Sequence, residues 1–193
     1  HNLNGKGALD MAIKTKDMML VSLFSALMVA GAFIKIPFPF VPLTFQPFFC
    51  ALSGVFLGAR LGALSQLLYI AMGLAGLPVF AYGGGLTYIF NPTFGYLLGF
   101  IAASFIIGRL SGNIRNPGFG DFIKALLPGL LVINLFGIPY FYLLENLYLG
   151  QDISARYVMS VIFLPYFIKD LLLFAAAAAA LPRIRAAVKK ARM

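Results

Sequence analysis

The chain has 193 residues, of which 61% are hydrophobic and only 11% are charged. Charged residues make up about 25% of an ordinary soluble domain, so this composition excludes such a domain and predicts a membrane protein. The net charge of +9 would suit nucleic-acid binding on a soluble protein, but the charges lie between and after apolar blocks, as topology signals do, and we expect no nucleic-acid partner.

The first ten residues (HNLNGKGALD) resemble an expression scar and are set aside from the fold. Residues 11–193 are then expected to form a single membrane domain. The only histidine, His1, lies in the scar, and the only cysteine, Cys50, lies inside an apolar run. We therefore expect no metal site, no internal disulfide and no cofactor.

Five apolar blocks follow in chain order, and a helix needs about 20 such residues to cross a bilayer. The blocks cover 18–36, 47–77, 92–107, 122–144 and 157–181. The second block is long enough for two short or tilted helices. Residues 58–62 (GARLG) offer a charged, glycine-flanked break near its middle, so the blocks could make five spans or six.

The positions of the basic residues decide between five and six spans. With six spans, one side of the membrane holds both termini and the residues Lys14, Lys16, Arg60, Arg109, Arg115, Lys124, Arg183, Arg185, Lys189, Lys190 and Arg192. The opposite side then holds only Lys35 and Arg156, together with Glu145 and Asp152. Because positive charge gathers on the cytoplasmic side, we predict an all-α bundle of six transmembrane helices with cytoplasmic N- and C-termini.

Two of the outer connections, 37–46 and 76–90, carry almost no charge and many aromatic, glycine and proline residues. The third outer connection is 145–156. Irregular backbone at membrane depth is tolerated where protein buries it or where it lines a cavity. We therefore expect the first two connections to fold back over a pocket, with apolar walls from Phe38, Phe40, Phe45 and Phe80.

Lys169 and Asp170 lie near the middle of the last apolar block. Charges at that depth cost several kcal/mol, and such residues usually face the bundle interior and serve a function. Adjacent helix positions point about 100° apart, so the two side chains cannot pair ideally and are expected to line one cavity. Tyr166 shares their general face. A pair that only compensates itself is the alternative interpretation.

Asn91 and Pro92 mark the start of a helix, since Asn is a favoured N-cap and Pro suits the first helical turn. Asn91 could serve as a cap alone or also offer its amide to a ligand. Just before it, residues 83–85 (GGG) provide a backbone that a ligand can approach closely. The motif G-x-x-x-x-G-K-S/T does not occur in the sequence, so we expect no Walker-type ATP hydrolysis.

Small residues recur at every fourth position in three blocks, and this spacing lets helices approach closely. They are Ser22, Ala26 and Ala30 in the first block, Gly54, Gly58 and Gly62 in the second, and Gly95, Gly99 and Ala103 in the third. Internal packing explains most such stripes. For the first block, an outward face for another membrane protein is equally open.

Residues 76–100 (GLPVFAYGGGLTYIFNPTFGYLLGF) resemble the BioY family, the biotin-specific substrate-capture (S) components of energy-coupling-factor (ECF) vitamin transporters. Residues 22–33 (SLFSALMVAGAF), 58–76 (GARLGALSQLLYIAMGLAG) and 168–174 (IKDLLLF) match as well, so the resemblance covers the chain from about Lys16 onward. It implies a six-helix bundle in a prokaryotic plasma membrane. Its outward biotin pocket would be closed by the loops after the first and third helices.

The resemblance also implies roles for individual residues. Asn91 and Asp170 would hold the ureido ring of biotin, and Lys169 suits either the ligand's carboxylate or a polar edge of the ring. Further candidate contacts are Thr44, Gln46, Tyr82, Gly84, Tyr88 and Tyr166. The stripe of Ser22, Ala26 and Ala30 would dock on a transmembrane coupling protein, and two ATPases would complete that complex.

Alternative functions are an S component for another vitamin, such as riboflavin or thiamin, and a non-transporting membrane scaffold. An enzyme is not expected. A two-aspartate intramembrane protease needs a second acid beside Asp170, and a metalloprotease needs ligands such as HExxH, which the sequence lacks.

Overall fold

The computed structural model describes residues 14–38, 40–112 and 118–191. The expected scar at residues 1–10 lies outside this part of the chain. Within it, five helices are long and apolar enough to cross a membrane. They cover Thr15–Phe33, Gln46–Leu74, Phe94–Ser111, Phe119–Tyr148 and Ala155–Ile184. The protein is thus mostly helical, as predicted from its apolar blocks.

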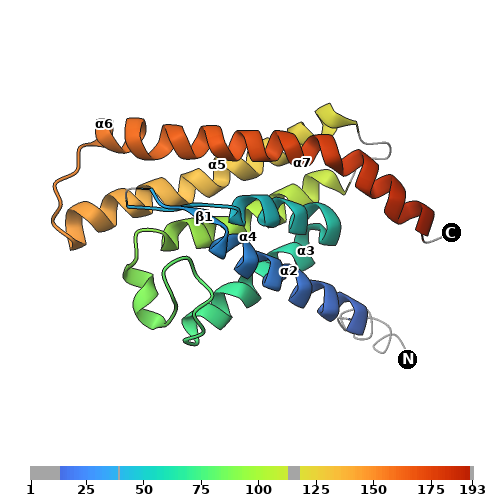
Figure 1. Cartoon of the computed structure of the whole chain (residues 1–193), viewed down its shortest axis with the longest axis horizontal. Coiled ribbons are helices and arrows are strands. Elements are labelled where there is room, and N and C mark those ends of the chain that lie inside the picture. The colour runs from blue at the N-terminus through green and yellow to red at the C-terminus, as the bar shows by residue number, and fades with distance from the viewer. Residues whose placement is uncertain (1–13, 39, 113–117, 192–193) are drawn as a thin grey trace, which may run out of the picture.

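The first half of the chain contains α2 (Thr15–Phe33), β1 (Lys35–Ile36), β2 (Leu43–Thr44), α3 (Gln46–Leu74), η1 (Leu86–Phe90) and α4 (Phe94–Ser111). The second half contains α5 (Phe119–Leu143), η2 (Leu144–Tyr148), α6 (Ala155–Tyr157), η3 (Val158–Phe163) and α7 (Leu164–Ala191). The π-helical η2 continues α5, and α6 with the π-helical η3 leads into α7, so two long helices pack along each other (Figure 1).

Helix α3 reverses its direction at Gly58. This residue has φ 78° and ψ 179°, a backbone conformation open essentially to glycine alone. Nε2 of Gln46 donates a hydrogen bond to the Tyr69 hydroxyl at 2.9 Å, whereas 23 residues of straight helix would separate them by about 35 Å. The limbs 46–57 and 59–74 therefore lie side by side, and the break expected within residues 58–62 is confirmed.

Glycines bring the two limbs of α3 and the neighbouring helices into backbone contact. A Cβ atom on Gly54 would lie 2.7 Å from the carbonyl oxygen of Ser104, and one on Gly62 would lie 2.5 Å from the Ser104 hydroxyl. On α4, a Cβ atom on Gly99 would lie 3.0 Å from the Cα atom of Ile133 in α5. Larger side chains at these positions would force the helices apart, so these stripes serve internal packing.

Small polar side chains tie the same helices together inside the apolar core. The Ser25 hydroxyl of α2 donates to the carbonyl oxygen of Ser65 at 2.7 Å. Nε2 of Gln66 donates to the Ser53 hydroxyl at 3.0 Å, and that hydroxyl lies 2.8 Å from the Ser104 hydroxyl of α4. Interhelical hydrogen bonds of this kind contribute on average about 0.6 kcal/mol each in a membrane protein, and they fix how the helices are turned.

The stripe on α2 differs from the two glycine stripes. Helix α2 packs on α3 through Val21, Phe24, Ser25 and Met28, which are buried. Ser22, Ala26 and Ala30 are exposed on another face of the helix. The stripe of Ser22, Ala26 and Ala30 is therefore not used for internal packing.

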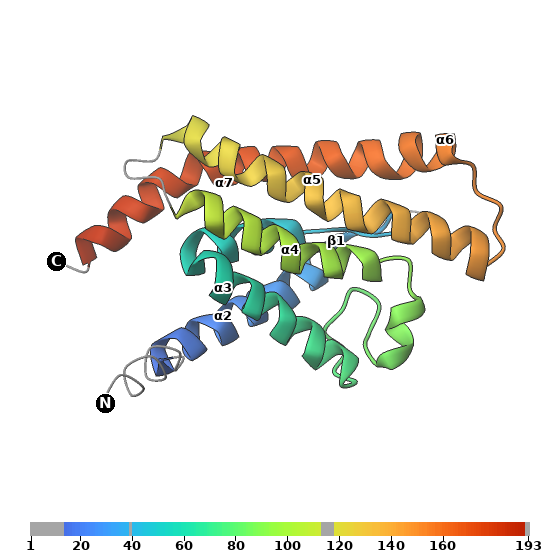
Figure 2. The same cartoon turned by 180° about the vertical axis from the view of Figure 1, so that it is seen from behind.

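The helix ends are sorted between the two ends of the molecule. The start of α2, the end of α4, the start of α5 and the end of α7 lie at one end (Figures 1 and 2). The opposite end holds η1 and the connection from η2 to α6 (Figure 2). The β1–β2 hairpin, with Lys35 paired to Thr44 and Ile36 to Leu43, leads from α2 into α3 and lies along the bundle (Figure 1).

Replacing Gly58 with alanine should lower the stability of the protein by about 1–3 kcal/mol, because a side chain strains the backbone at this φ and ψ. No atom lies within 4 Å of the position of the new Cβ, so the loss would come from backbone strain and not from a clash. Thermal unfolding of the purified protein in detergent measures it. Gly120→Ala is the matched control, since Gly120 has equally open surroundings without a positive φ. Equal melting temperatures for the two variants would contradict the strained turn.

Candidate functional site

A cavity opens between the β1–β2 hairpin, the start of α4 and the middle of α7. It contains about 440 Å³ of space between atoms, the open mouth included. The lining residues are Val41, Pro42, Thr44, Gln46, Pro47, Ala81, Tyr88, Thr93, Tyr96, Leu97, Phe100, Tyr166, Lys169 and Asp170. Six of the residues singled out from the sequence are among them: Thr44, Gln46, Tyr88, Tyr166, Lys169 and Asp170.

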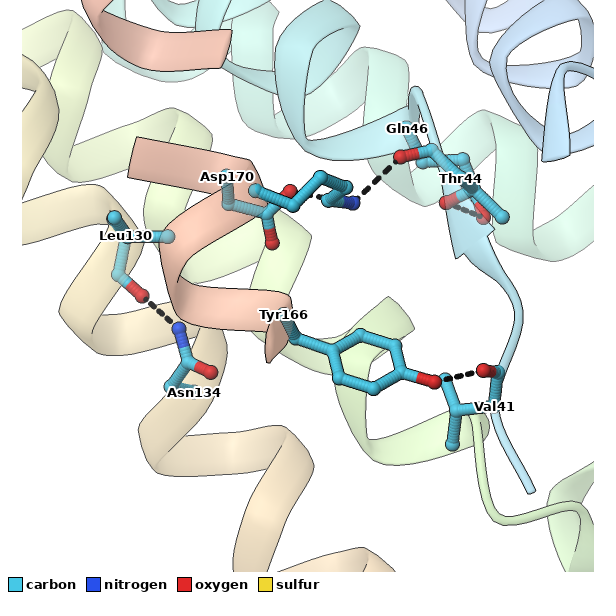
Figure 3. A network of polar contacts seen from close by, with 8 residues as sticks. Val41, Thr44, Gln46, Leu130, Asn134, Tyr166 and Asp170 are labelled. Atoms are coloured by element: carbon cyan, nitrogen blue, oxygen red, sulfur yellow. Dashed lines mark hydrogen bonds and ion pairs between the residues drawn. The ribbon is translucent and has the colours of Figure 1, made fainter. Parts of the chain in front are cut away.

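The charged pair of α7 lies in this cavity. Nζ of Lys169 is 2.6 Å from Oδ1 of Asp170 and donates a hydrogen bond to the carbonyl oxygen of Thr44 at 2.8 Å (Figure 3). Within the described part of the chain, Oδ1 of Asp170 has no partner in hydrogen-bond geometry, despite the short ion-pair distance. The contact is thus an electrostatic one made at a poor angle, as the divergence of adjacent helix positions predicts, and the buried carboxylate keeps unused acceptor capacity.

The hydroxyl of Tyr96 is a second buried polar atom of the cavity with unused capacity. It has no hydrogen-bond partner among residues 14–38, 40–112 and 118–191. A buried polar group left unpaired costs about 1–3 kcal/mol, and native structures contain few of them. The Tyr96 hydroxyl and the Asp170 carboxylate together favour a polar ligand that both donates and accepts hydrogen bonds.

The β1–β2 hairpin covers the cavity and is fixed to α7. The Tyr166 hydroxyl donates a hydrogen bond to the carbonyl oxygen of Val41 (Figure 3). The ring of Phe38 packs edge-on against the Tyr166 ring, with centroids 5.7 Å apart. Lys169 holds the hairpin a second time through Thr44. This arrangement agrees with the cover expected from the connection 37–46.

The second cover comes from the segment before α4. The Tyr88 and Thr93 hydroxyls lie 2.8 Å apart, and burial raises the pKa of Tyr88 above its usual value, so this phenol remains a neutral hydrogen-bonding group. Oδ1 of Asn91 accepts hydrogen bonds from the backbone N and the hydroxyl of Thr93, at 3.0 and 2.7 Å. Asn91 caps this turn, although α4 itself begins only at Phe94. Asn91 is outside the cavity lining and orients Thr93, which is part of it.

Two other residues singled out from the sequence also lie outside the lining. Tyr82 is 52% exposed, and Nζ of Lys35 lies 5.3 Å from its ring centroid. Gly84 is needed by the loop itself, because a Cβ atom there would lie 2.0 Å from the carbonyl oxygen of Leu77. Its neighbours Gly83 and Gly85 have φ of 113° and 103°, so the glycine run meets a backbone requirement.

Thr44 and Gln46 line the cavity with their polar atoms already engaged. The Thr44 hydroxyl donates to Oε1 of Gln46 at 3.1 Å, and Nε2 of Gln46 donates to the Tyr69 hydroxyl. These bonds connect the end of the β1–β2 hairpin to α3. In the described residues there is no group of three or more His, Cys, Asp or Glu side chains that could hold a metal ion.

The prediction that Phe38, Phe40, Phe45 and Phe80 form the apolar walls was wrong. None of these residues lines the cavity. Phe40 and Phe45 are partly exposed, at 40% and 36%, and Phe80 is buried in the core against the rings of Tyr69 and Tyr88. The apolar walls are instead Val41, Pro42, Pro47, Ala81, Leu97 and Phe100.

The contribution of α4 was missed altogether. Thr93, Tyr96, Leu97 and Phe100 line the cavity, and they follow the helical spacing of three and four residues that places side chains on one face. That spacing, directly after Asn91, was the signal available in the sequence. Tyr96 is the most important of the four, since its buried hydroxyl is unpaired among the described residues.

The chain matches known proteins along nearly its whole length. The BioY family matches residues 6–190. "Probable biotin transporter BioY" from Lysinibacillus sphaericus is 42% identical over 178 residues, covering 92% of this chain and 91% of that protein. "Biotin transporter BioY" from Thermotoga maritima is 37% identical over 164 residues, covering 84% of this chain and 92% of that protein.

A solved structure has the same fold. It is described as the S-component for biotin from an ECF-type ABC transporter. The two structures superpose with a TM-score of 0.67 at 23% sequence identity, and the match covers 90% of this chain and 95% of that one. The arrangement of helices described above is therefore that of an S-component.

Proposed function

Because this chain belongs to the BioY family, we propose that it binds biotin and serves biotin uptake as the substrate-specific subunit of an ECF transporter. The relatives named above are biotin transporters and not enzymes. In this chain, the observation that carries the proposal is a membrane-depth cavity. It holds a buried carboxylate in poorly aligned contact with Lys169 and a buried hydroxyl that has no hydrogen-bond partner among the described residues.

The chemistry of biotin suits this pair of groups. Its ureido ring donates two N–H bonds and accepts at its oxygen, and its thioether ring and chain are apolar. The carboxylate of Asp170 would accept from the ureido N–H groups, and the hydroxyl of Tyr96 would donate to the ureido oxygen. Leu97, Phe100 and the prolines of the hairpin would pack on the apolar atoms. Binding would then give a partner to the Tyr96 hydroxyl, which is costly to bury without one, and would use the free acceptor capacity of Asp170.

Lys169 supports this recognition from the side. Its ammonium compensates the charge of Asp170 and holds the carbonyl oxygen of Thr44, so the hairpin stays over the ligand. Asn91 would act through Thr93, and Tyr88 through the same threonine. Tyr166 would keep the hairpin in place through Val41.

The alternatives are less well supported. An S component for riboflavin or thiamin would not explain why the named relatives are biotin transporters. A membrane scaffold would account for the glycine contacts between helices, but it would have no use for a charged pair facing a cavity. Intramembrane charges of this kind usually serve binding or transport.

The membrane topology that fits this function has six spans in the plasma membrane, with both termini in the cytoplasm. In support, the reversal at Gly58 divides α3 into two antiparallel limbs about 18 and 24 Å long, so the chain leaves α3 on the side where it entered. Both limbs are shorter than a bilayer core of about 30 Å, and the membrane would have to thin around them. Basic residues also gather where the helix ends meet: Lys14, Lys16, Arg60, Arg109, Lys124 and Arg183. That excess marks a cytoplasmic side.

The exposed small-residue face of α2 is the surface we assign to the transmembrane coupling protein of the ECF module. Ser22, Ala26 and Ala30 are exposed on it, and α2 otherwise packs mainly on α3. Small side chains allow a partner helix to approach closely in a membrane. Two ATPases bound to the coupling protein would supply the energy, since this chain has no nucleotide motif of its own.

Asp170→Asn and Tyr96→Phe should each weaken biotin binding at least about tenfold, or roughly 1.4 kcal/mol. Each change removes one of the unpaired groups and leaves the size of the side chain almost unchanged. Titration of the purified proteins with biotin measures the effect. Asp152→Asn removes an exposed carboxylate from the outer loop and should bind like the unchanged protein. Unaltered affinity in both cavity variants would refute the site.

Ala26→Trp and Ala30→Trp should bind biotin normally but take it up poorly, because an indole on this face blocks close approach of a partner helix. Uptake is measured in cells that contain the whole transporter and depend on it for biotin. The control is Leu172→Trp, which enlarges a side chain on α7 that is already 67% exposed. Equal uptake by all three variants would remove the docking face from the account.

A further inference from the structure

The charges inside the cavity are balanced before any ligand arrives. Lys169 contributes one positive charge and Asp170 one negative charge, and they lie in contact. Biotin brings a carboxylate on its flexible chain. An ionised carboxylate out of water is costly unless it is paired, so a cation near the end of the ligand's chain would stabilise the bound ligand.

Lys169 is poorly suited to be that cation. Its ammonium already serves Asp170 and the carbonyl oxygen of Thr44. If it turned to the ligand's carboxylate, Asp170 would lose its counter-ion at membrane depth, and an uncompensated buried charge is strongly destabilising. The hairpin would also lose the bond through Thr44.

Lys35 is a cation beside the cavity, although it is not itself one of the lining residues. It lies in β1, at the base of the hairpin, and Nζ donates a hydrogen bond to the carbonyl oxygen of Ala81, which lines the cavity. The same ammonium lies over the ring of Tyr82. Among the described residues, Lys169 and Asp170 form the one ion pair. Lys35 therefore has no acidic partner among these residues.

We propose that Lys35 is the counter-ion for the carboxylate of the bound ligand. The inference rests on the proposed function and assigns the two ends of the ligand. The ureido head lies deep, against Asp170 and Tyr96, and the chain runs outward past Ala81 to the ammonium of Lys35. A carboxylate is a stronger acceptor for an ammonium than a neutral carbonyl oxygen, so it replaces the oxygen of Ala81.

In this assignment, the contacts of Lys35 with the two covers of the cavity change when the ligand binds. The ammonium of Lys35 joins the hairpin to the segment before α4 through Ala81 and Tyr82. When the carboxylate takes over that ammonium, both covers contact the ligand at one point. An uncharged ligand of the same shape would fill the cavity without making this contact.

Titration with two ligands tests the proposal. The probes are biotin and its methyl ester, which differ in charge at the end of the chain. Lys35→Gln should weaken biotin binding by about tenfold to a hundredfold, the range for a hydrogen bond to a charged group. It should change binding of the methyl ester by less than about twofold. Lys35→Arg should bind biotin nearly as well as the unchanged protein.

Two further variants make the result selective. Arg156→Gln removes an exposed cation elsewhere on the same side of the molecule and should leave both affinities unchanged. Lys169→Met should weaken both ligands alike, since it acts on the head. Equal losses of biotin and ester in Lys35→Gln, or no loss of either, would overturn the role of Lys35. Biotin binding that still depends on Asp170 would leave the proposed function standing in both cases.

Discussion

A lysine and an aspartate held at membrane depth on α7 are the constraint on which the site depends. Neither charge is tolerated in hydrocarbon without polar partners, and their own contact has poor geometry. The hairpin after α2 supplies a backbone oxygen to Lys169, and the start of α4 brings Tyr96 to the same cavity. In the proposed function, the Asp170 carboxylate and the unpaired Tyr96 hydroxyl would give a urea two points of recognition within apolar walls.

The rest of the fold makes room for this cavity. Because α3 turns at Gly58, its two limbs are short and the hairpin before it enters the bundle. Glycines on α3 and α4 allow backbone contact below the cavity, and serine and glutamine side chains lock those helices together. The base is therefore tightly packed. Individual hydrogen bonds from Tyr166 and Lys169 connect the hairpin to α7, and the bond from Lys35 to Ala81 connects the two covers to each other.

The sequence predicted the features that carry a strong physical signal. A charged pair inside an apolar block identified α7, and a charged glycine-flanked break identified the turn of α3. The sequence could not show which aromatic residues face the cavity. An aromatic side chain is equally hydrophobic whether it lines the cavity, lies in the core or is exposed. Phe80, which was predicted to form a wall, lies in the core, whereas Tyr96, which was not predicted, lines the cavity. Thr93 and Tyr96 were missed because they lie among strongly apolar neighbours, and Tyr82 and Gly84 satisfy needs of their own loop.

The most direct measurement is an experimental structure of the purified protein with biotin bound. The account predicts the ureido ring within hydrogen-bonding distance of the Asp170 carboxylate and the Tyr96 hydroxyl, beneath the β1–β2 hairpin. A ligand bound elsewhere, or an Asp170 side chain that faces lipid or is saturated by protein groups away from any cavity, would contradict it.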